Sequence, residues 1–146
     1  MANRVSDWTV KLNQQAKRAR QVDVRPSQND FWIFTLRVVD EISGSNLASE
    51  FIGTYDSYDE LLDIARERLG HPANVQELLD DLMKQNGFAS NERVWSSQRG
   101  DVGVFPSDDF GIISGVCMGG SYYTINTEGN FNSYPIDSVV KFWEIR

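Results

Sequence analysis

Apolar residues recur at helical spacing through the first half of the chain. Residues 6–20 carry an apolar stripe formed by Trp8, Leu12 and Ala16. A stripe that repeats every three to four residues is typical of a helix with one buried face. After the linker RQVDVRPSQ, the apolar run at about 31–42 follows Asp30 and predicts a second helix. This helix should end at Gly44, because glycine readily adopts the left-handed conformation that closes helices.

Two further helices are predicted from paired polar residues that precede apolar stripes. Ser57 and Glu60 have the spacing of a capping box, in which two side chains satisfy free backbone N–H groups at a helix start. Asn74 and Glu77 repeat this spacing, and Gly87 supplies a stop for the second of these helices.

The pattern changes after about residue 92. Short segments rich in β-branched and aromatic residues follow, separated by Gly, Asn, Asp and Pro: RVWSS, GDVGVF, GIISGVCM, SYYTIN and FWEIR. Such segments predict strands, and TEGN at 127–130 predicts a tight turn between two of them. Helices followed by strands indicate an α+β fold, with N-terminal helices packed on a C-terminal antiparallel sheet.

The length of 146 residues predicts a single domain, 1–146, that buries about two-thirds of its unfolded surface. We expect three parts: an N-terminal basic helix at 1–22, a helical half at 27–88 and an antiparallel β half at 92–146. No internal repeat or low-complexity segment interrupts this division.

Charge is distributed unevenly along the chain. The formal net charge is −7, but residues 1–25 carry +4 and the remainder −11. An acidic body argues against nucleic acid as a partner, because phosphate contacts need a basic face. The basic first segment either docks on an acidic partner or is the solvated face of a helix.

Neither a membrane partner nor export is expected from the sequence. No apolar run approaches the roughly 18 residues that a membrane span needs. The start MANRVSDWTV lacks the apolar core of a signal peptide, so we expect synthesis and retention in a cytoplasm.

Candidate catalytic and metal-binding groups are few. Cys117 lies in the strand-like run VCM, where cysteine usually behaves as a small buried hydrophobe, and His71 lies in a helix-to-helix turn, where we expect it to be solvated. One thiol and one imidazole make a zinc site implausible. The carboxylate pairs Asp80-Asp81 and Asp108-Asp109 lack a spaced ligand loop. We therefore predict no metal site and no cofactor.

Three stretches in order resemble the NlpC-type cell-wall peptidases, a papain-like family of cysteine hydrolases, and look closest to small members from phage tail gene clusters. NDFWIF stands where that family has Asp-Cys-x-x-Phe at the start of its central helix. QRGDVGVF is similar to its Arg-Gly-Asp-leading strand, and ISGVCMG to its His-Val-Gly-Ile-Tyr-x-Gly strand. Between them, SGSNLASEFIGTYDSYDELL looks like the linker of the phage-type members. The resemblance implies a papain-like, NlpC-type architecture.

The family's chemistry requires a thiolate at the helix N-terminus and an imidazole on a neighbouring strand. The resemblance places the nucleophile position on Phe31 and the base position on Ile113. Phenylalanine has no nucleophilic atom and isoleucine cannot accept a proton. The resemblance therefore implies a pseudoenzyme without catalytic residues, in which both positions are vestigial.

The leading hypothesis is a noncatalytic structural or adaptor component of a phage tail, in the tip, hub or baseplate region of the virion. Its partners would be other phage tail proteins, and a peptidoglycan glycan is a further candidate ligand. Aromatic side chains, which are favoured at interfaces, could supply contacts: Trp8, Trp32, Trp95, Trp143, Tyr122, Tyr123, Tyr134 and Phe142. The alternatives are an active peptidoglycan hydrolase with a non-standard site built on Cys117 and His71, and a small acidic cytosolic interaction or inhibitor protein.

Overall fold

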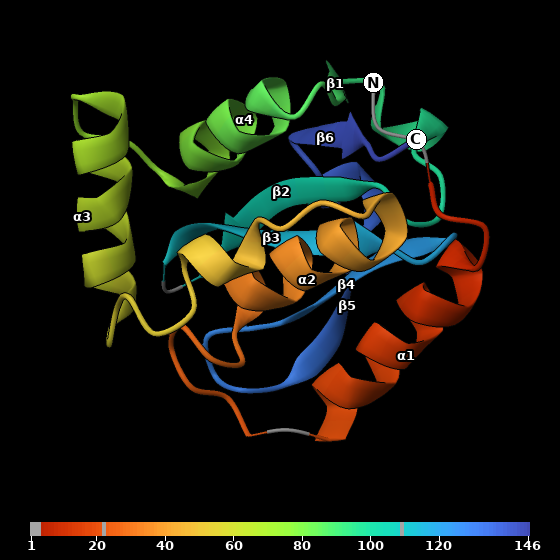
Figure 1. Cartoon of the computed structure of the whole chain (residues 1–146), viewed down its shortest axis with the longest axis horizontal. Helices are drawn as coiled ribbons and strands as arrows, with labels where there is room; N and C mark the ends of the chain where they lie inside the picture. Colours follow the sequence, from red (N-terminus) through yellow and green to blue (C-terminus); the bar gives the residue numbers. More distant parts are fainter. Residues whose placement is uncertain (1–3, 22, 109) are drawn as a thin grey trace.

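The computed structural model describes residues 4–21, 23–108 and 110–146 and shows an α+β fold (Figure 1). The helices come first: α1 (Trp8–Gln21), α2 (Phe31–Ser43), α3 (Tyr58–Leu69) and α4 (Val75–Gln85). The strands follow: β1 (Ala89–Asn91), β2 (Val102–Ser107), β3 (Gly111–Cys117), β4 (Ser121–Ile125), β5 (Phe131–Pro135) and β6 (Lys141–Glu144). Three short 3₁₀ helices lie between them: η1 (Ala48–Glu50), η2 (Val94–Ser96) and η3 (Ile136–Ser138). The predicted α+β class is confirmed.

The six strands form one sheet in the order β1-β6-β2-β3-β4-β5, and every neighbouring pair is antiparallel. The helices α2 and α4 cover one face of this sheet. The Ser114 hydroxyl on β3 lies 2.8 Å from the Thr35 hydroxyl on α2. The indole N–H of Trp143 on β6 donates to Asp80 on α4 at 3.2 Å. The helical half therefore packs on the sheet as the sequence pattern predicts.

The helix boundaries follow from local capping. Asp30 caps α2, and Gly44 ends it in the left-handed conformation with φ 77°. Ser57 caps α3 by accepting from the Glu60 N–H. Asn74 and Glu77 form the predicted capping box of α4, which ends at Gln85, two residues before the glycine stop.

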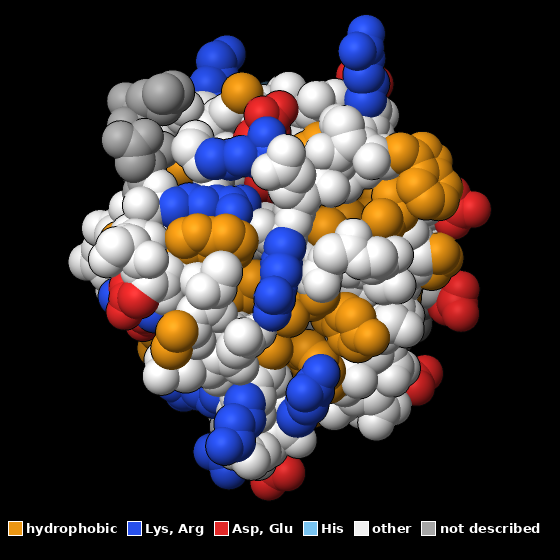
Figure 2. Space-filling view, turned by 90° about the vertical axis from the view of Figure 1, so that its right-hand side faces the viewer, with side chains coloured by type: hydrophobic (Ala, Val, Ile, Leu, Met, Phe, Trp, Pro, Cys, Tyr) orange, Lys and Arg blue, Asp and Glu red, His pale blue; other side chains and the backbone are white. Residues whose placement is uncertain are grey.

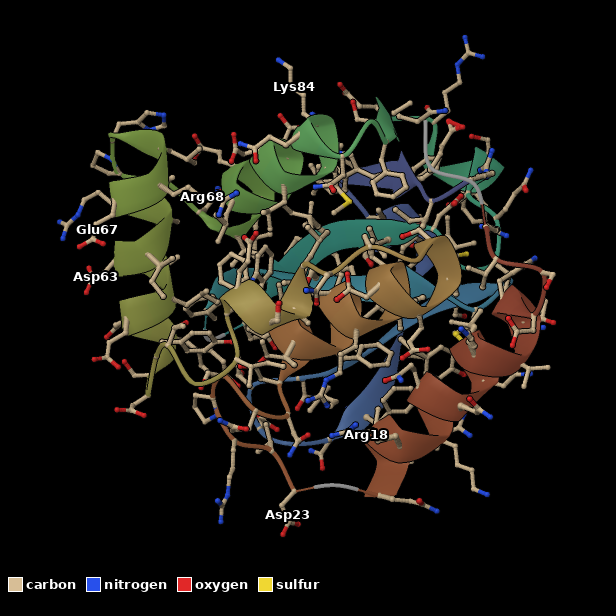
Figure 3. The ribbon with its side chains drawn as sticks, viewed as in Figure 1. Arg18, Asp23, Asp63, Glu67, Arg68 and Lys84 are labelled. Atoms are coloured by element: carbon tan, nitrogen blue, oxygen red, sulfur yellow. The ribbon has the colours of Figure 1, made fainter. Side chains whose placement is uncertain are left out.

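Arg68 is in the last turn of α3, and its side chain bridges to α4 (Figure 3). Its guanidinium donates to Asp81 at 3.0 Å and to Glu50 at 3.3 Å. The second carboxylate of the Asp80-Asp81 pair is thus bound to an arginine, and the first to Lys141 and Trp143. Both carboxylates serve contacts between elements of the fold.

Two sequence predictions about the β half are wrong. RVWSS is not a strand, because Val94–Ser96 forms η2. The hydroxyl groups of Ser96 and Ser97 donate to backbone carbonyls three residues earlier, which favours a turn over an extended chain. The β half also begins before residue 92, because Ala89–Asn91 pairs with β6.

The other face of the sheet is packed through a pair of glycines. Gly103 on β2 stands opposite Gly115 on β3 in the register. A Cβ atom on Gly103 would lie 2.8 Å from Tyr122 Cε2 and 3.1 Å from Val139 Cγ1. The absence of side chains therefore lets aromatic rings lie directly against the strands.

The substitution Gly115→Ala is expected to lower the free energy of unfolding by about 1–3 kcal/mol. Its Cβ would lie 2.8 Å from Phe105 Cζ and 2.8 Å from the backbone oxygen of Tyr123, and backbone cannot rotate away. Urea denaturation would measure the loss. Gly120→Ala is the matched control, because a Cβ there meets nothing within 4 Å. Equal losses in the two variants would contradict the close packing.

Candidate functional site

The N-terminus of α2 is the position at which the resemblance places a nucleophile. Asp30 caps this helix and is fully buried. Its Oδ1 accepts from the Ile33 N–H at 2.8 Å. Its Oδ2 accepts from the Ser27 N–H at 2.8 Å and from the Tyr55 hydroxyl at 2.5 Å. The carboxylate thereby fastens the preceding loop and the segment before α3 to the start of α2.

Burial controls the protonation of this pair. Burial raises the pKa of the Asp30 carboxyl, although the hydrogen bonds from Ile33, Tyr55 and Ser27 act in the opposite direction. Burial, followed by the charge of Asp30, raises the pKa of the Tyr55 hydroxyl far above its usual value of 10. Tyr55 is therefore a hydrogen-bond donor at any ordinary pH.

The substitution Tyr55→Phe is expected to lower the free energy of unfolding by about 1.5–3 kcal/mol at neutral pH, because it removes a buried hydrogen bond to a charged group. The loss should shrink as pH falls through the folded-state pKa of Asp30, since a neutral carboxyl accepts a weaker bond. Urea denaturation at several pH values measures both effects.

The sign of the wild-type dependence follows from the raised pKa of Asp30. Above the folded-state pKa of Asp30, its buried charge lowers the free energy of unfolding. The free energy of unfolding therefore rises as pH falls from that pKa toward the pKa of Asp in the unfolded chain, about 3.9. Tyr123→Phe is the control, because no hydrogen bond of that hydroxyl is found within the described ranges. A Tyr55→Phe loss that is independent of pH would contradict this coupling.

Phe31 is the first residue of α2, and its side chain is fully buried. Its ring centroid lies 5.3 Å from that of Tyr58 and 5.7 Å from that of Phe110. Tyr58 and Phe110 are themselves 5.3 Å apart, so the three rings form one aromatic cluster. The place at which the resemblance puts a reactive thiolate is filled by packed aromatic side chains.

Ile113 does not face Phe31. Ser114 points toward α2, because its hydroxyl contacts that of Thr35. Successive side chains of a strand point to opposite faces, so Ile113 lies on the far face of the sheet, the face of its register partner Phe105. The structure therefore does not bring the two predicted positions together. On β3, Ile112 and Val116 lie on the same face as Ser114.

Sequence reasoning missed the hydroxyl pair of Thr35 and Ser114, which lies beside the backbone of Phe31 at the start of α2. Both residues are fully buried. The Thr35 hydroxyl donates to the Phe31 carbonyl at 2.8 Å, and the Ser114 hydroxyl lies 3.4 Å from the same oxygen. The only signal in the sequence is one serine within the apolar run GIISGVCM.

The remaining reactive side chains occupy separate parts of the fold. Cys117 is buried at the end of β3, and burial raises the pKa of its thiol. Its backbone N–H donates to the Asp101 carbonyl. His71 is exposed on the connection between α3 and α4. Both local predictions, a buried cysteine and a solvated histidine, are confirmed.

A second buried carboxylate, Asp101 of the QRGDVGVF stretch, ties both ends of the described chain together. Its Oδ1 lies 3.4 Å from the Arg4 guanidinium and its Oδ2 lies 2.6 Å from that of Arg146. It also accepts from the N–H groups of Gln98 and Ile145 at 2.8 and 3.1 Å. Sequence reasoning did not foresee this cluster.

The structure shows no cluster of side chains suited to a metal ion among the described residues. Within residues 4–21, 23–108 and 110–146, no group of three or more His, Cys, Asp and Glu side chains could hold a metal ion. Asp108 is exposed, and Asp109 lies outside the described residues. No described helix is long and apolar enough to cross a membrane.

The eight aromatic residues singled out from the sequence differ greatly in exposure. Trp95 on η2 is 73% exposed. Half of them are buried: Trp32, Trp143, Tyr122 and Phe142. The other three are partly buried: Trp8, Tyr123 and Tyr134. Trp95 is therefore the aromatic side chain that is best placed for an interface.

Comparison with protein-family models gives one finding. The model described as "Domain of unknown function (DUF6950)" matches residues 3–145. The chain belongs to this family. Comparisons with curated proteins and with solved structures gave no match.

Proposed function

We propose that this chain is a noncatalytic structural or adaptor component of a phage tail, built on a degenerate scaffold of the papain-like, NlpC-type cell-wall peptidases. The observation that carries the proposal is the buried aromatic ring of Phe31 at the start of α2. A hydrolase of the resembled type needs a thiolate there, with an imidazole beside it. The assignment to a tail, in its tip, hub or baseplate region, rests on the resemblance alone.

An adaptor role also needs a surface for its partners, which would be other tail proteins or a peptidoglycan glycan. Trp95, 73% exposed, lies on η2, and Val140, 45% exposed, lies two residues after the end of η3; η2 and η3 contact each other. Figure 2 shows hydrophobic side chains interspersed with Lys and Arg on one side of the molecule. Exposed tryptophan is a frequent anchor of protein interfaces.

A muropeptide-release assay tests the absence of catalysis. The wild type and Cys117→Ser should both leave purified peptidoglycan uncleaved, because the thiol is buried and its pKa is raised. Turnover by the wild type that is lost in Cys117→Ser would overturn the proposal in favour of an active hydrolase with a non-standard site.

Mass spectrometry of purified phage particles from the source tests the location. We expect the wild-type chain in the particles, and a reduced amount of a Trp95→Ser variant. Val10→Ser is the matched control, because Val10 is another exposed hydrophobic side chain, 53% exposed, on α1. Absence of the wild-type chain from particles, with capture of one cytosolic protein instead, would favour the small interaction protein.

A further inference from the structure

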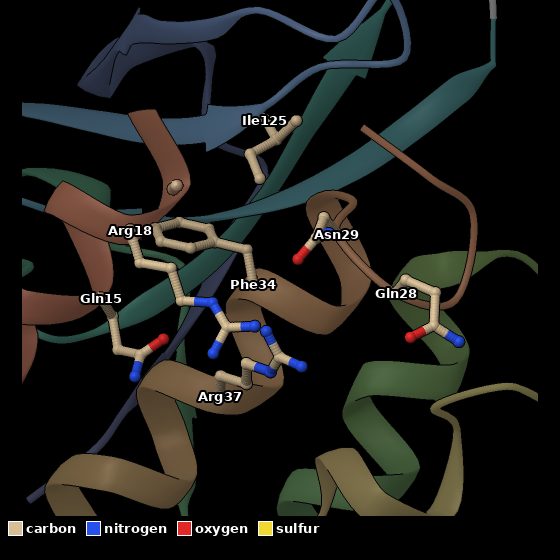
Figure 4. A pocket seen from close by; sticks show the side chains of 8 residues that line it. Gln15, Arg18, Gln28, Asn29, Phe34, Arg37 and Ile125 are labelled. Atoms are coloured by element: carbon tan, nitrogen blue, oxygen red, sulfur yellow. The ribbon is translucent and has the colours of Figure 1, made fainter. Parts of the chain in front are cut away.

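A small depression between α1 and α2 is rimmed by polar groups that donate hydrogen bonds (Figure 4). The space within it that a water-sized group could occupy is only about 10 Å³, so an anion would bind at its mouth. Arg18 comes from α1 and Arg37 from α2. The amide side chains of the rim are Gln15, Gln28 and Asn29, and the apolar lining includes Phe34 and Ile125. No carboxylate lines the depression.

The two guanidinium groups lie beside each other at this depression (Figure 4). Neither Arg18 nor Arg37 forms an ion pair or a side-chain hydrogen bond with any described residue. Burial, followed by the like charge of Arg18, lowers the pKa of Arg37, and the charge of Asp30 acts in the opposite direction. Two adjacent positive charges that are not directly paired with a carboxylate repel each other, and a bound anion would relieve this repulsion.

The two acidic residues within α2 form contacts with other groups. Glu41 faces Lys11, with 3.9 Å between the charged atoms. Asp40 accepts from the backbone N–H groups of Leu47 and Ala48 at 2.7 and 2.9 Å. Arg18 and Arg37 also line a neighbouring groove with Asp40 and Glu41, but neither carboxylate forms an ion pair with either guanidinium group.

We propose that Arg18 and Arg37 form a binding site for a phosphate group, with Gln15, Gln28 and Asn29 as further donors. Guanidinium groups match phosphate oxygens through paired N–H donors. A phosphate monoester carries about −1.5 to −2 charges at pH 7, which balances two arginines, whereas a carboxylate would balance one. The site depends neither on the resemblance nor on a role in a phage tail.

Isothermal titration with inorganic phosphate and with phenyl phosphate, at constant ionic strength set with chloride, tests the site on the full chain. The wild type should bind saturably. Arg18→Gln and Arg37→Gln should each bind at least tenfold more weakly. Lys17→Gln, an exposed neighbour on α1 that does not line the depression, changes the net charge equally and should bind within twofold of the wild type.

The two ligands separate the sources of the phosphate group. Tighter binding of phenyl phosphate indicates a phosphate ester, and equal or tighter binding of inorganic phosphate indicates the free ion; either result supports the site. Absence of saturable binding, an equal loss in Lys17→Gln, or acetate binding as tightly as phosphate would overturn it.

A thermal melt without phosphate shows that the variants remain folded. Arg18→Gln should keep or raise the melting temperature, because Arg18 is exposed and its removal relieves repulsion with Arg37. A lower melting temperature for Arg18→Gln than for the wild type would show that Arg18 stabilises the fold, and would contradict the like-charge arrangement.

Discussion

Asp101→Asn is expected to lower the free energy of unfolding by about 3–5 kcal/mol, because it leaves two arginines without the carboxylate that they share. Asp101 is fully buried and contacts Arg4 and Arg146 through different oxygens. An asparagine keeps the size of the side chain but turns an N–H₂ donor toward groups that donate. Urea denaturation monitored by tryptophan fluorescence would measure the loss.

Asp81→Asn is the matched control for this substitution. Asp81 also pairs with an arginine, Arg68, but its side chain is 27% exposed. We expect a loss of no more than about 1 kcal/mol there, because solvent screens exposed ion pairs. Similar losses in the two variants would show that burial does not determine how much Asp101 contributes to the free energy of unfolding.

The contacts of Asp101 explain why the QRGDVGVF stretch carries an aspartate in this fold. The resemblance treats it as a family motif, and the structure shows what its carboxylate does. Asp101 accepts the backbone N–H of Ile145, and the guanidinium of Arg4 donates to the Ile145 and Arg99 carbonyls at 2.5 and 2.8 Å. The aspartate therefore acts in structure, by holding distant parts of the chain together.

The helical half could be predicted from the sequence because its signals are local. The cap of α2 by Asp30 and the capping box of Asn74 and Glu77 depend on residues three positions apart. The β half was predicted less well for the opposite reason. The polar segment Ala89–Asn91 becomes a strand only through its pairing with β6, far along the chain.

The candidate site shows the same division between local and long-range information. That Phe31 begins a helix follows from the polar residues before it. The direction of Ile113 does not follow from the pattern, because β3 from Ile113 to Cys117 is buried on both faces. Alternation of polar and apolar residues, which would indicate the facing of each side chain, is absent from such a strand. Only the contact of Ser114 with Thr35 fixes it.

Phe31→Ala is expected to lower the free energy of unfolding by about 3–5 kcal/mol, because it opens a cavity in a fully buried aromatic cluster. The loss tests whether this position now serves packing. Val10→Ala is the control, because Val10 is 53% exposed, and it should cost no more than about 0.5 kcal/mol. A loss below about 1 kcal/mol in Phe31→Ala would contradict the cluster.

Double-mutant cycles with milder variants test the geometry of the same position. Phe31→Leu combined with Phe110→Leu should show a coupling of about 0.5–1.5 kcal/mol, because the two rings are in contact. Phe31→Leu combined with Ile113→Val should be additive within about 0.5 kcal/mol, since the side chains lie on opposite sides of β3. A strong coupling between Phe31 and Ile113 would contradict this facing and would agree with the arrangement that the resemblance implies. Additivity would agree with Ile113 lying on the face of the sheet that points away from α2.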